Sequence, residues 1–233
     1  MSSLIQGKGD LIAFVMSVLR SPDQRRHLFR WIVSKRQNYL LKKPMPWMTF
    51  DAIDFIANRL QNGCRIFEYG SGGSTLFWLK WKPELVSVEH DSSWHALMAQ
   101  RIQPGTGVQY RLVPPEKRAA ARLGDASDSN LFASSDELYR GFSFETYVRQ
   151  IEKFPDRYFD LVVVDGRARP SCLRWSAQKV KPGGFLVLDN AEREYYTSRV
   201  KECLGNYRVR EFRGIGPCNN YFWQTNVYER VAG

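Results

Sequence analysis

Two glutamates and a glycine-rich turn between them form the clearest chemical pattern in this sequence. Glu68 precedes by two residues a turn that begins at Gly70, and Glu89 follows Gly70 by nineteen residues. Glycine permits positive φ angles and close approach of a ligand to the backbone, because it has no Cβ. In nucleotide-binding βαβ units an acid about 20 residues after the first glycine hydrogen-bonds the ribose hydroxyls. The spacing therefore predicts a pocket for a nucleoside-containing cofactor.

Two strands and a helix are needed to position these groups. Ile66 and Phe67 form a short apolar run that ends at Glu68, and residues 85–89 alternate as a second strand ending at Glu89. Between them, a helix is expected to begin at Ser74 and Thr75, with unpaired backbone N–H groups at its first turn. Strand, turn, helix and strand together predict a parallel βαβ unit.

Acidic residues also follow later predicted strands. Residues 158–166 form an apolar run that ends in Asp165, and residues 181–190 pass from a Pro-Gly-Gly turn into a run that ends in Asp189 and Asn190. Residues 207–212 and 221–228 alternate between apolar and polar side chains and predict an antiparallel pair at one edge of the sheet.

The pattern Glu-x-Gly-x-Gly-x-Ser-Thr, residues 68–75, resembles the first motif of class I S-adenosylmethionine-dependent methyltransferases. Dinucleotide enzymes usually have a third glycine where this chain has Thr75. The likeness covers residues 47–228, with four motifs in the order of the family. The turn followed by residues 88–91 and Trp94 is most like a group of bacterial proteins of that family.

This resemblance implies roles for individual residues. Glu68 and the turn would hold the amino-acid part of S-adenosylmethionine, Glu89 its ribose, and Asp165 would serve the cofactor and the chemistry. His90 and Trp94 would border the adenine, although an exposed polar role for His90 is an equal alternative. The turn residues expected to contact the cofactor are Gly70, Ser71, Gly72, Ser74 and Thr75.

The resemblance also implies a metal. Asp165, Asp189 and Asn190 match by position the magnesium ligands of catechol-type O-methyltransferases, and three oxygen donors suit a hard cation. The sequence then departs from that pattern, since residues 191–193 are not apolar. Alternatively, Asp165 serves the acceptor directly and Asp189 is only a helix cap.

Two arginines, Arg167 and Arg169, follow Asp165 at the end of the same predicted strand. Ligands of open α/β sheets bind at that edge, so the pair is expected either to hold an anionic substrate or to cap nearby carboxylates. Asp189 and Asn190, at the end of the next predicted strand, are also expected to contact the substrate.

The predicted fold is α/β: a Rossmann-like, doubly wound, mostly parallel sheet with a C-terminal antiparallel pair and an N-terminal helical extension. Residues 1–46 form the basic extension and residues 47–233 the cofactor-binding domain, with 114–144 a lid or substrate-binding insertion. A helix is expected over 195–204. Trp47 is expected in the core rather than over the pocket.

The net charge of +10 is concentrated in residues 20–43, which hold eight basic residues and one acidic residue and so contribute +7. This amphipathic segment packs on the main domain, contacts an anionic membrane surface or contacts nucleic acid; the first is favoured and the last is the least favoured. The apolar run 11–19 is too short to span a bilayer. Four scattered cysteines indicate neither disulfides nor zinc, and a cytoplasmic, possibly membrane-peripheral protein is expected.

The preferred functional hypothesis is O-methylation of a hydroxyl on a small molecule or a glycan. The alternatives are an RNA methyltransferase that uses the basic arm, a nicotinamide-dependent oxidoreductase, and a non-catalytic nucleoside-binding module. The sequence does not predict an oligomeric state.

Overall fold

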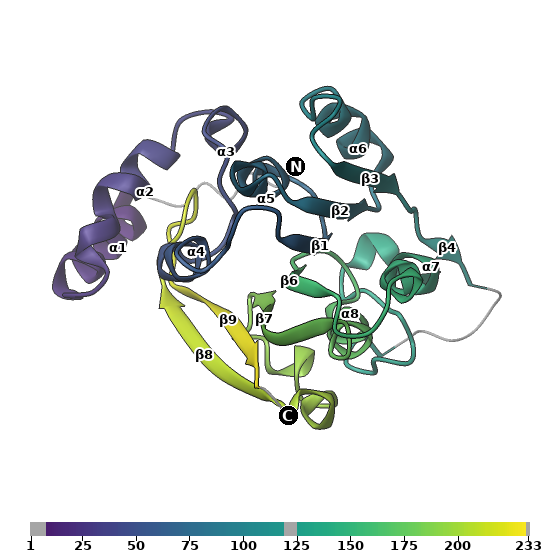
Figure 1. Cartoon of the computed structure of the whole chain (residues 1–233). Coiled ribbons are helices and arrows are strands. Elements are labelled where there is room, and N and C mark those ends of the chain that lie inside the picture. Colours follow the sequence, from purple (N-terminus) through teal and green to yellow (C-terminus); the bar gives the residue numbers. More distant parts are fainter. Residues whose placement is uncertain (1–7, 119–124, 232–233) are drawn as a thin grey trace.

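A twisted seven-stranded sheet forms the centre of the computed structural model, which describes residues 8–118 and 125–231 (Figure 1). Its order is β3-β2-β1-β6-β7-β9-β8. The parallel strands are β1 (Arg65–Tyr69), β2 (Glu84–Glu89), β3 (Val108–Leu112), β6 (Phe159–Val164) and β7 (Val180–Asp189). The strands β8 (Tyr207–Gly214) and β9 (Trp223–Arg230) are antiparallel, and β9 is also antiparallel to β7. The predicted fold class is confirmed.

Helices cover both faces of the sheet because alternate residues of the central strand point to opposite faces. Ile66 packs in a core with α4 (Phe50–Ala57) and α5 (Gly73–Trp78), whereas Phe67 and Tyr69 pack in a second core with α7 (Glu145–Val148) and α8 (Arg169–Ser176). The remaining elements of this part of the chain are η2 (Leu79–Trp81), α6 (Ser92–Ala99) and η4 (Arg149–Lys153).

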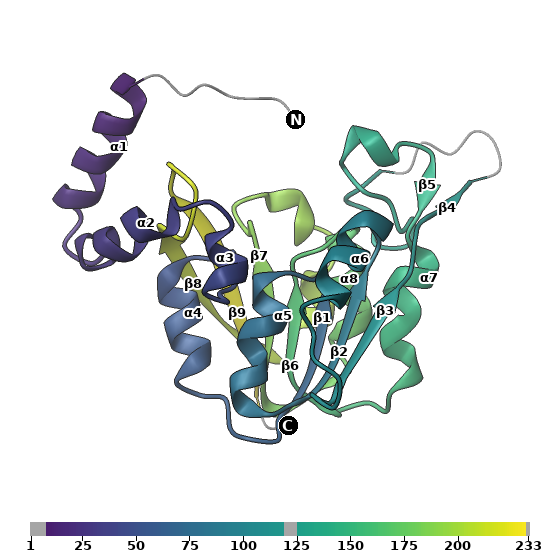
Figure 2. The ribbon, with the colours of Figure 1, turned by 90° about the horizontal axis from the view of Figure 1, so that it is seen from above.

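The described part of the N-terminal extension is mostly helical and packs on the α4 side of the sheet (Figure 2). Its elements are α1 (Lys8–Arg20), η1 (Arg25–His27), α2 (Leu28–Ser34) and α3 (Tyr39–Lys42). Phe14 and Trp31 are buried, with ring centroids 5.0 Å apart, in the core that contains α4. Arg30 pairs with Asp54 of α4 at 2.6 Å. None of the helices described is long and apolar enough to cross a membrane.

Within the 114–144 segment, a small two-stranded sheet lies beside the main one, and Phe132 and Phe144 are buried in the main core. Strand β4 (Glu116–Lys117) pairs antiparallel with β5 (Phe142–Ser143), and η3 (Glu137–Tyr139) precedes β5. Residues 119–124 of this predicted insertion lie outside the described residues.

Two local predictions are wrong. The expected helix over 195–204 is instead two short turns, η5 (Glu194–Tyr196) and η6 (Lys201–Leu204). Tyr196 is buried beside the guanidinium of Arg169, so tertiary contact rather than helical periodicity fixes this segment. Trp47, expected in the core, is half exposed and lines the cavity described next.

Candidate functional site

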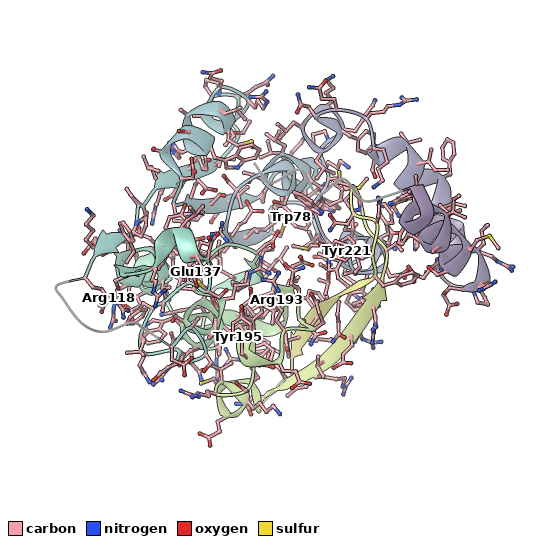
Figure 3. The ribbon with its side chains drawn as sticks, turned by 180° about the vertical axis from the view of Figure 1, so that it is seen from behind. Trp78, Arg118, Glu137, Arg193, Tyr195 and Tyr221 are labelled. Carbon is pink, nitrogen blue, oxygen red and sulfur yellow. The ribbon has the colours of Figure 1, made fainter. Side chains whose placement is uncertain are left out.

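A cavity of about 820 Å³ opens at the carboxyl ends of β1, β2, β6 and β7. This is where ligands of open α/β sheets bind. Residues of the predicted site line it together with side chains of the N-terminal extension, of η3 and of the loop before β9, which holds Tyr221 (labelled in Figure 3). The lining includes Arg36, Tyr39, Leu40, Met45, Trp47, Gly70, Ser71, Gly72, Gly73, Ser74, Glu89, His90, Asp91, Trp94, Leu138, Tyr139, Asp165, Gly166, Arg167, Arg169, Asp189, Asn190 and Tyr221.

The glycine turn is pressed against two other backbone segments. Gly70 has a φ of +88°, and a Cβ there would lie 2.9 Å from the Cα of Gly166, which follows β6. A Cβ on Gly73 would collide with the carbonyl oxygens of Leu40 and Met45. The turn therefore contacts both the sheet and the N-terminal extension. The turn forms the floor of the cavity, and the extension forms one of its walls.

Glu68 lies under the turn and is absent from the cavity lining. It is fully buried, and its carboxylate accepts hydrogen bonds from Thr75 Oγ1 at 2.5 Å, Trp78 Nε1 at 3.0 Å and Ser87 Oγ at 2.9 Å. Thr75 Oγ1 in turn accepts from the backbone N–H of Gly72. Burial raises the pKa of Glu68, and these hydrogen bonds oppose that rise. The predicted contacts of Glu68 and Thr75 with a cofactor do not fit these positions, because both side chains hold the turn from beneath.

Replacement of Glu68 by alanine is expected to lower the free energy of unfolding by about 3 kcal/mol, because buried donors on Thr75, Trp78 and Ser87 lose their acceptor. Urea unfolding measures this loss. Glu84→Ala is a matched control, since that glutamate is exposed at the start of β2 and its pair with Arg65 contributes little. Equal stability of the two variants would contradict the structural role of Glu68.

Glu89 has the opposite environment, since it ends β2 at the cavity. Its Oε2 accepts from the backbone N–H of Ser71 at 3.0 Å and from Ser71 Oγ at 2.8 Å, and its Oε1 accepts from the backbone N–H groups of His90 at 2.8 Å and Asp91 at 2.9 Å. Burial alone would raise its pKa, but the hydrogen bonds and the nearby His90 ring lower the pKa to about 2. Glu89 is thus a fixed anion at the edge of the cavity.

His90 and Trp94 both line the cavity beside Glu89. Trp94 Nε1 donates to the carbonyl oxygen of Ser71 at 2.8 Å, so the indole is fixed over the glycine turn. The His90 side chain is only 11 % exposed, and its ring centroid lies 5.1 Å from that of Tyr139. The alternative of an exposed polar His90 is therefore wrong, and both rings form walls of the cavity on which a base could stack.

Arg169 occupies the space among the three predicted metal ligands. Its guanidinium donates to Asp165 Oδ1 at 2.9 Å, to Asn190 Oδ1 at 3.2 Å and to the backbone oxygen of Asp189. The carboxylate of Asp189 faces β9, where its Oδ1 accepts from Trp223 Nε1 at 3.0 Å and from Thr225 Oγ1 at 2.6 Å.

The donor set does not fit the predicted magnesium ion, because the guanidinium of Arg169 already occupies Asp165 Oδ1 and Asn190 Oδ1 and the carboxylate of Asp189 faces β9. No group of three or more His, Cys, Asp or Glu side chains suited to a metal occurs among the described residues. Asp189 is not a helix cap either, since its partners belong to a strand. Burial raises the pKa of Asp165 and of Asp189, while the charge of Arg169 lowers both.

The two predicted arginines have different environments. Arg169 is 11 % exposed and fully engaged with Asp165, Asn190 and backbone oxygens, which agrees with the capping alternative. Arg167 is 38 % exposed and pairs with Asp136 at 3.0 Å, next to Tyr139. Arg167 therefore links the 114–144 segment to the cavity and remains within reach of a ligand.

Sequence reasoning missed the contribution of the N-terminal extension and of Tyr221 to the cavity. Tyr39 and Leu40 belong to α3, which packs on Gly73, and Arg36 lies in the turn just before it. The sequence shows that residue 73 is a glycine of the turn, but it does not show that the backbone of Leu40 and Met45 packs against it.

Comparison with known proteins agrees with this arrangement at the level of the fold. No family model matches the chain, and no curated protein sequence matches it. A candidate O-methyltransferase from Klebsiella pneumoniae is similar in structure, with a TM-score of 0.56 and 16 % identity over 98 % of this chain and 93 % of that one. The O-methyltransferase TomG from Streptomyces achromogenes has a TM-score of 0.51 and 16 % identity over 99 % and 93 % of the two chains. An O-methyltransferase from Bacillus cereus has a TM-score of 0.50 and 15 % identity over 98 % and 93 %. The chain has the fold of the class I S-adenosylmethionine-dependent methyltransferases.

Proposed function

We propose that this protein is an S-adenosylmethionine-dependent methyltransferase that methylates a hydroxyl of a small molecule or a sugar. The observation that most strongly supports this is the pairing of the Gly70–Gly73 turn with the fixed anion Glu89 on neighbouring strand ends of one cavity. The structures of similar fold include O-methyltransferases from Bacillus cereus in complex with SAH and from Streptomyces achromogenes in complex with SAM.

The cavity residues fit the cofactor. Glu89 would accept from the ribose hydroxyls, with Ser71 Oγ giving up its bond to Oε2, while Trp94 and His90 would flank the adenine. Backbone groups of the turn, rather than Glu68, would hold the amino-acid end. Bound there, the cofactor supplies an electrophilic methyl group on a sulfonium.

Asp165 is proposed as the base. Arg169 holds its Oδ1, so the other carboxylate oxygen remains to accept a proton from an acceptor hydroxyl. When an acceptor hydroxyl lies in line with the cofactor's methyl group, Asp165 would take up the proton that the hydroxyl releases on methylation. Because burial raises the pKa of this carboxyl, it is a stronger base than an exposed aspartate. Positioning of the two reactants contributes the larger share of the rate.

Calorimetry with S-adenosylmethionine and, separately, with NAD tests the cofactor assignment. We expect saturable binding of S-adenosylmethionine and none of NAD. Transfer of a labelled methyl group to a panel of phenols, sugars and RNA then tests the acceptor class. Binding of NAD alone, or transfer only to RNA or to amines, would contradict the proposal.

Exhaustive chelation of divalent metals is expected to leave the rate of methyl transfer unchanged, since Arg169 supplies the cation beside Asp165. The measurement compares rates in the presence of a chelator with rates in added magnesium. A rate that falls on chelation and recovers with magnesium would show that a metal displaces the guanidinium in the active state.

A further inference from the structure

The two N-terminal helices present large apolar side chains to solvent. On α1, Ile12 is 65 % exposed, and on α2, Phe29 is 76 % exposed and Ile32 lies one turn further on. The other exposed apolar residues of α1 are Leu11, Met16 and Leu19. The opposite sides of the same helices are buried through Phe14, Val18 and Trp31. Each helix is thus apolar on its outer side as well, which packing within this chain does not explain.

The basic residues of this segment divide into two groups. Arg26 and Arg30 pair with Asp51 and Asp54 of α4 and so attach the helices to the main domain. Arg20 and Arg25 are exposed, and within the described part of the chain neither has an acidic partner. Arg25 lies in η1 just before α2, and Arg36 lies in the turn just after it, so basic residues flank the apolar pair Phe29 and Ile32 along the chain.

We propose that this surface, defined by Ile12, Met16, Leu19, Phe29, Ile32, Arg20 and Arg25, docks on an anionic lipid bilayer. Aliphatic side chains beside arginines are the composition of helices that lie in the membrane interface. Arginines gain energy near anionic lipids, and the apolar side chains enter the acyl boundary. Helix α1 has 13 residues and is too short to span, so it lies along the surface.

Two other occupants suit the surface less well. A second copy of this chain would bring arginines against arginines across a symmetric contact. Single-stranded RNA is bound by stacking on aromatic rings, and Phe29 is the only aromatic residue in the surface as defined. An anionic bilayer offers its acyl region to the aliphatic side chains and its negative headgroups to the arginines.

The surface adjoins the cavity through α3. Arg36 and Tyr39 line the cavity, and Arg36 lies in the turn that connects α2 to α3. Figure 2 shows α1 projecting at the end of the sheet where α3 lies. The docking proposal does not depend on the proposed methyl transfer, because binding is measured without activity.

Sedimentation of the full chain with vesicles tests the proposal. Vesicles of phosphatidylcholine alone are compared with vesicles of equal parts phosphatidylcholine and phosphatidylglycerol, at low and at high salt. We expect binding only to the anionic vesicles, weaker at high salt. The pair Arg20→Gln and Arg25→Gln together, and the pair Phe29→Ser and Ile32→Ser together, are each expected to weaken partition about tenfold or more.

Two controls match these variants on another face. Arg208→Gln and Val209→Ser replace exposed residues of β8 with the same chemistry, and both are expected to bind vesicles as the unmodified chain does. Thermal unfolding verifies that all variants are folded. Equal binding to neutral vesicles, or unchanged binding by both test variants, would overturn the proposal. A dimer that the Phe29 and Ile32 variant dissociates, with no vesicle binding, would assign the surface to a second copy instead.

Discussion

Replacement of Glu89 by alanine is expected to weaken binding of S-adenosylmethionine at least about 100-fold, because a carboxylate that accepts two ribose hydroxyls makes two hydrogen bonds to a charged group. The effect is large because Glu89 is almost fully buried and held in place by four donors. Isothermal calorimetry measures the change in Kd. Since the pKa of Glu89 is lowered to about 2, the carboxylate is ionised and the affinity should not change through this group between about pH 5 and about pH 8.

Glu84→Ala is the matched control for this experiment. Glu84 begins β2 and Glu89 ends it, so Glu84 lies at the end of the strand away from the cavity. Its side chain is 67 % exposed. We expect an unchanged Kd for this variant. Unchanged affinity in a folded Glu89→Ala protein would remove the proposed ribose contact and, with it, the cofactor assignment.

Arg169→Met is expected to lower the free energy of unfolding by about 3 kcal/mol at neutral pH, because it leaves the partly buried carboxyl of Asp165 without its cation. The same change is expected to abolish methyl transfer, since Asp165, Asp189 and Asn190 lose the group that joins them. Urea unfolding and a labelled-methyl assay measure the two effects.

The loss of stability in Arg169→Met should depend on pH. Burial raises the pKa of Asp165 and of Asp189 above their unfolded values, and removal of the guanidinium raises both further. A carboxyl of raised pKa makes the folded state less stable as the pH rises, so the deficit should be larger at about pH 8 than at about pH 5.

Arg167→Met is the control for Arg169→Met. Arg167 is the neighbouring arginine, but its pair with Asp136 is partly exposed, and its loss should cost no more than about 1 kcal/mol. An Arg169→Met protein as stable as Arg167→Met, with no pH dependence, would show that Asp165 does not need this partner.

The sequence by itself determined the strands that end at or beside Glu68, Glu89, Asp165 and Asp189, the C-terminal antiparallel pair and the position of Glu89. These features depend on local patterns: apolar runs of strand length, glycines where a turn needs positive φ, and acids at strand ends. The carboxyl ends of parallel strands share one edge, so the glycine turn, Glu89 and Asp165 had to meet there.

Only the tertiary structure decided which of these polar groups face the cavity. Glu68 and Glu89 are both acids at the ends of neighbouring strands, yet Thr75, Trp78 and Ser87 close over the first and leave the second at the cavity. Arg169 takes the place expected for a metal because it begins α8 and its guanidinium reaches Asp165, Asn190 and the backbone oxygen of Asp189. The sequence also could not predict that α3 supplies a wall of the cavity or which side of α1 faces outward. Both depend on contacts between residues far apart in the chain.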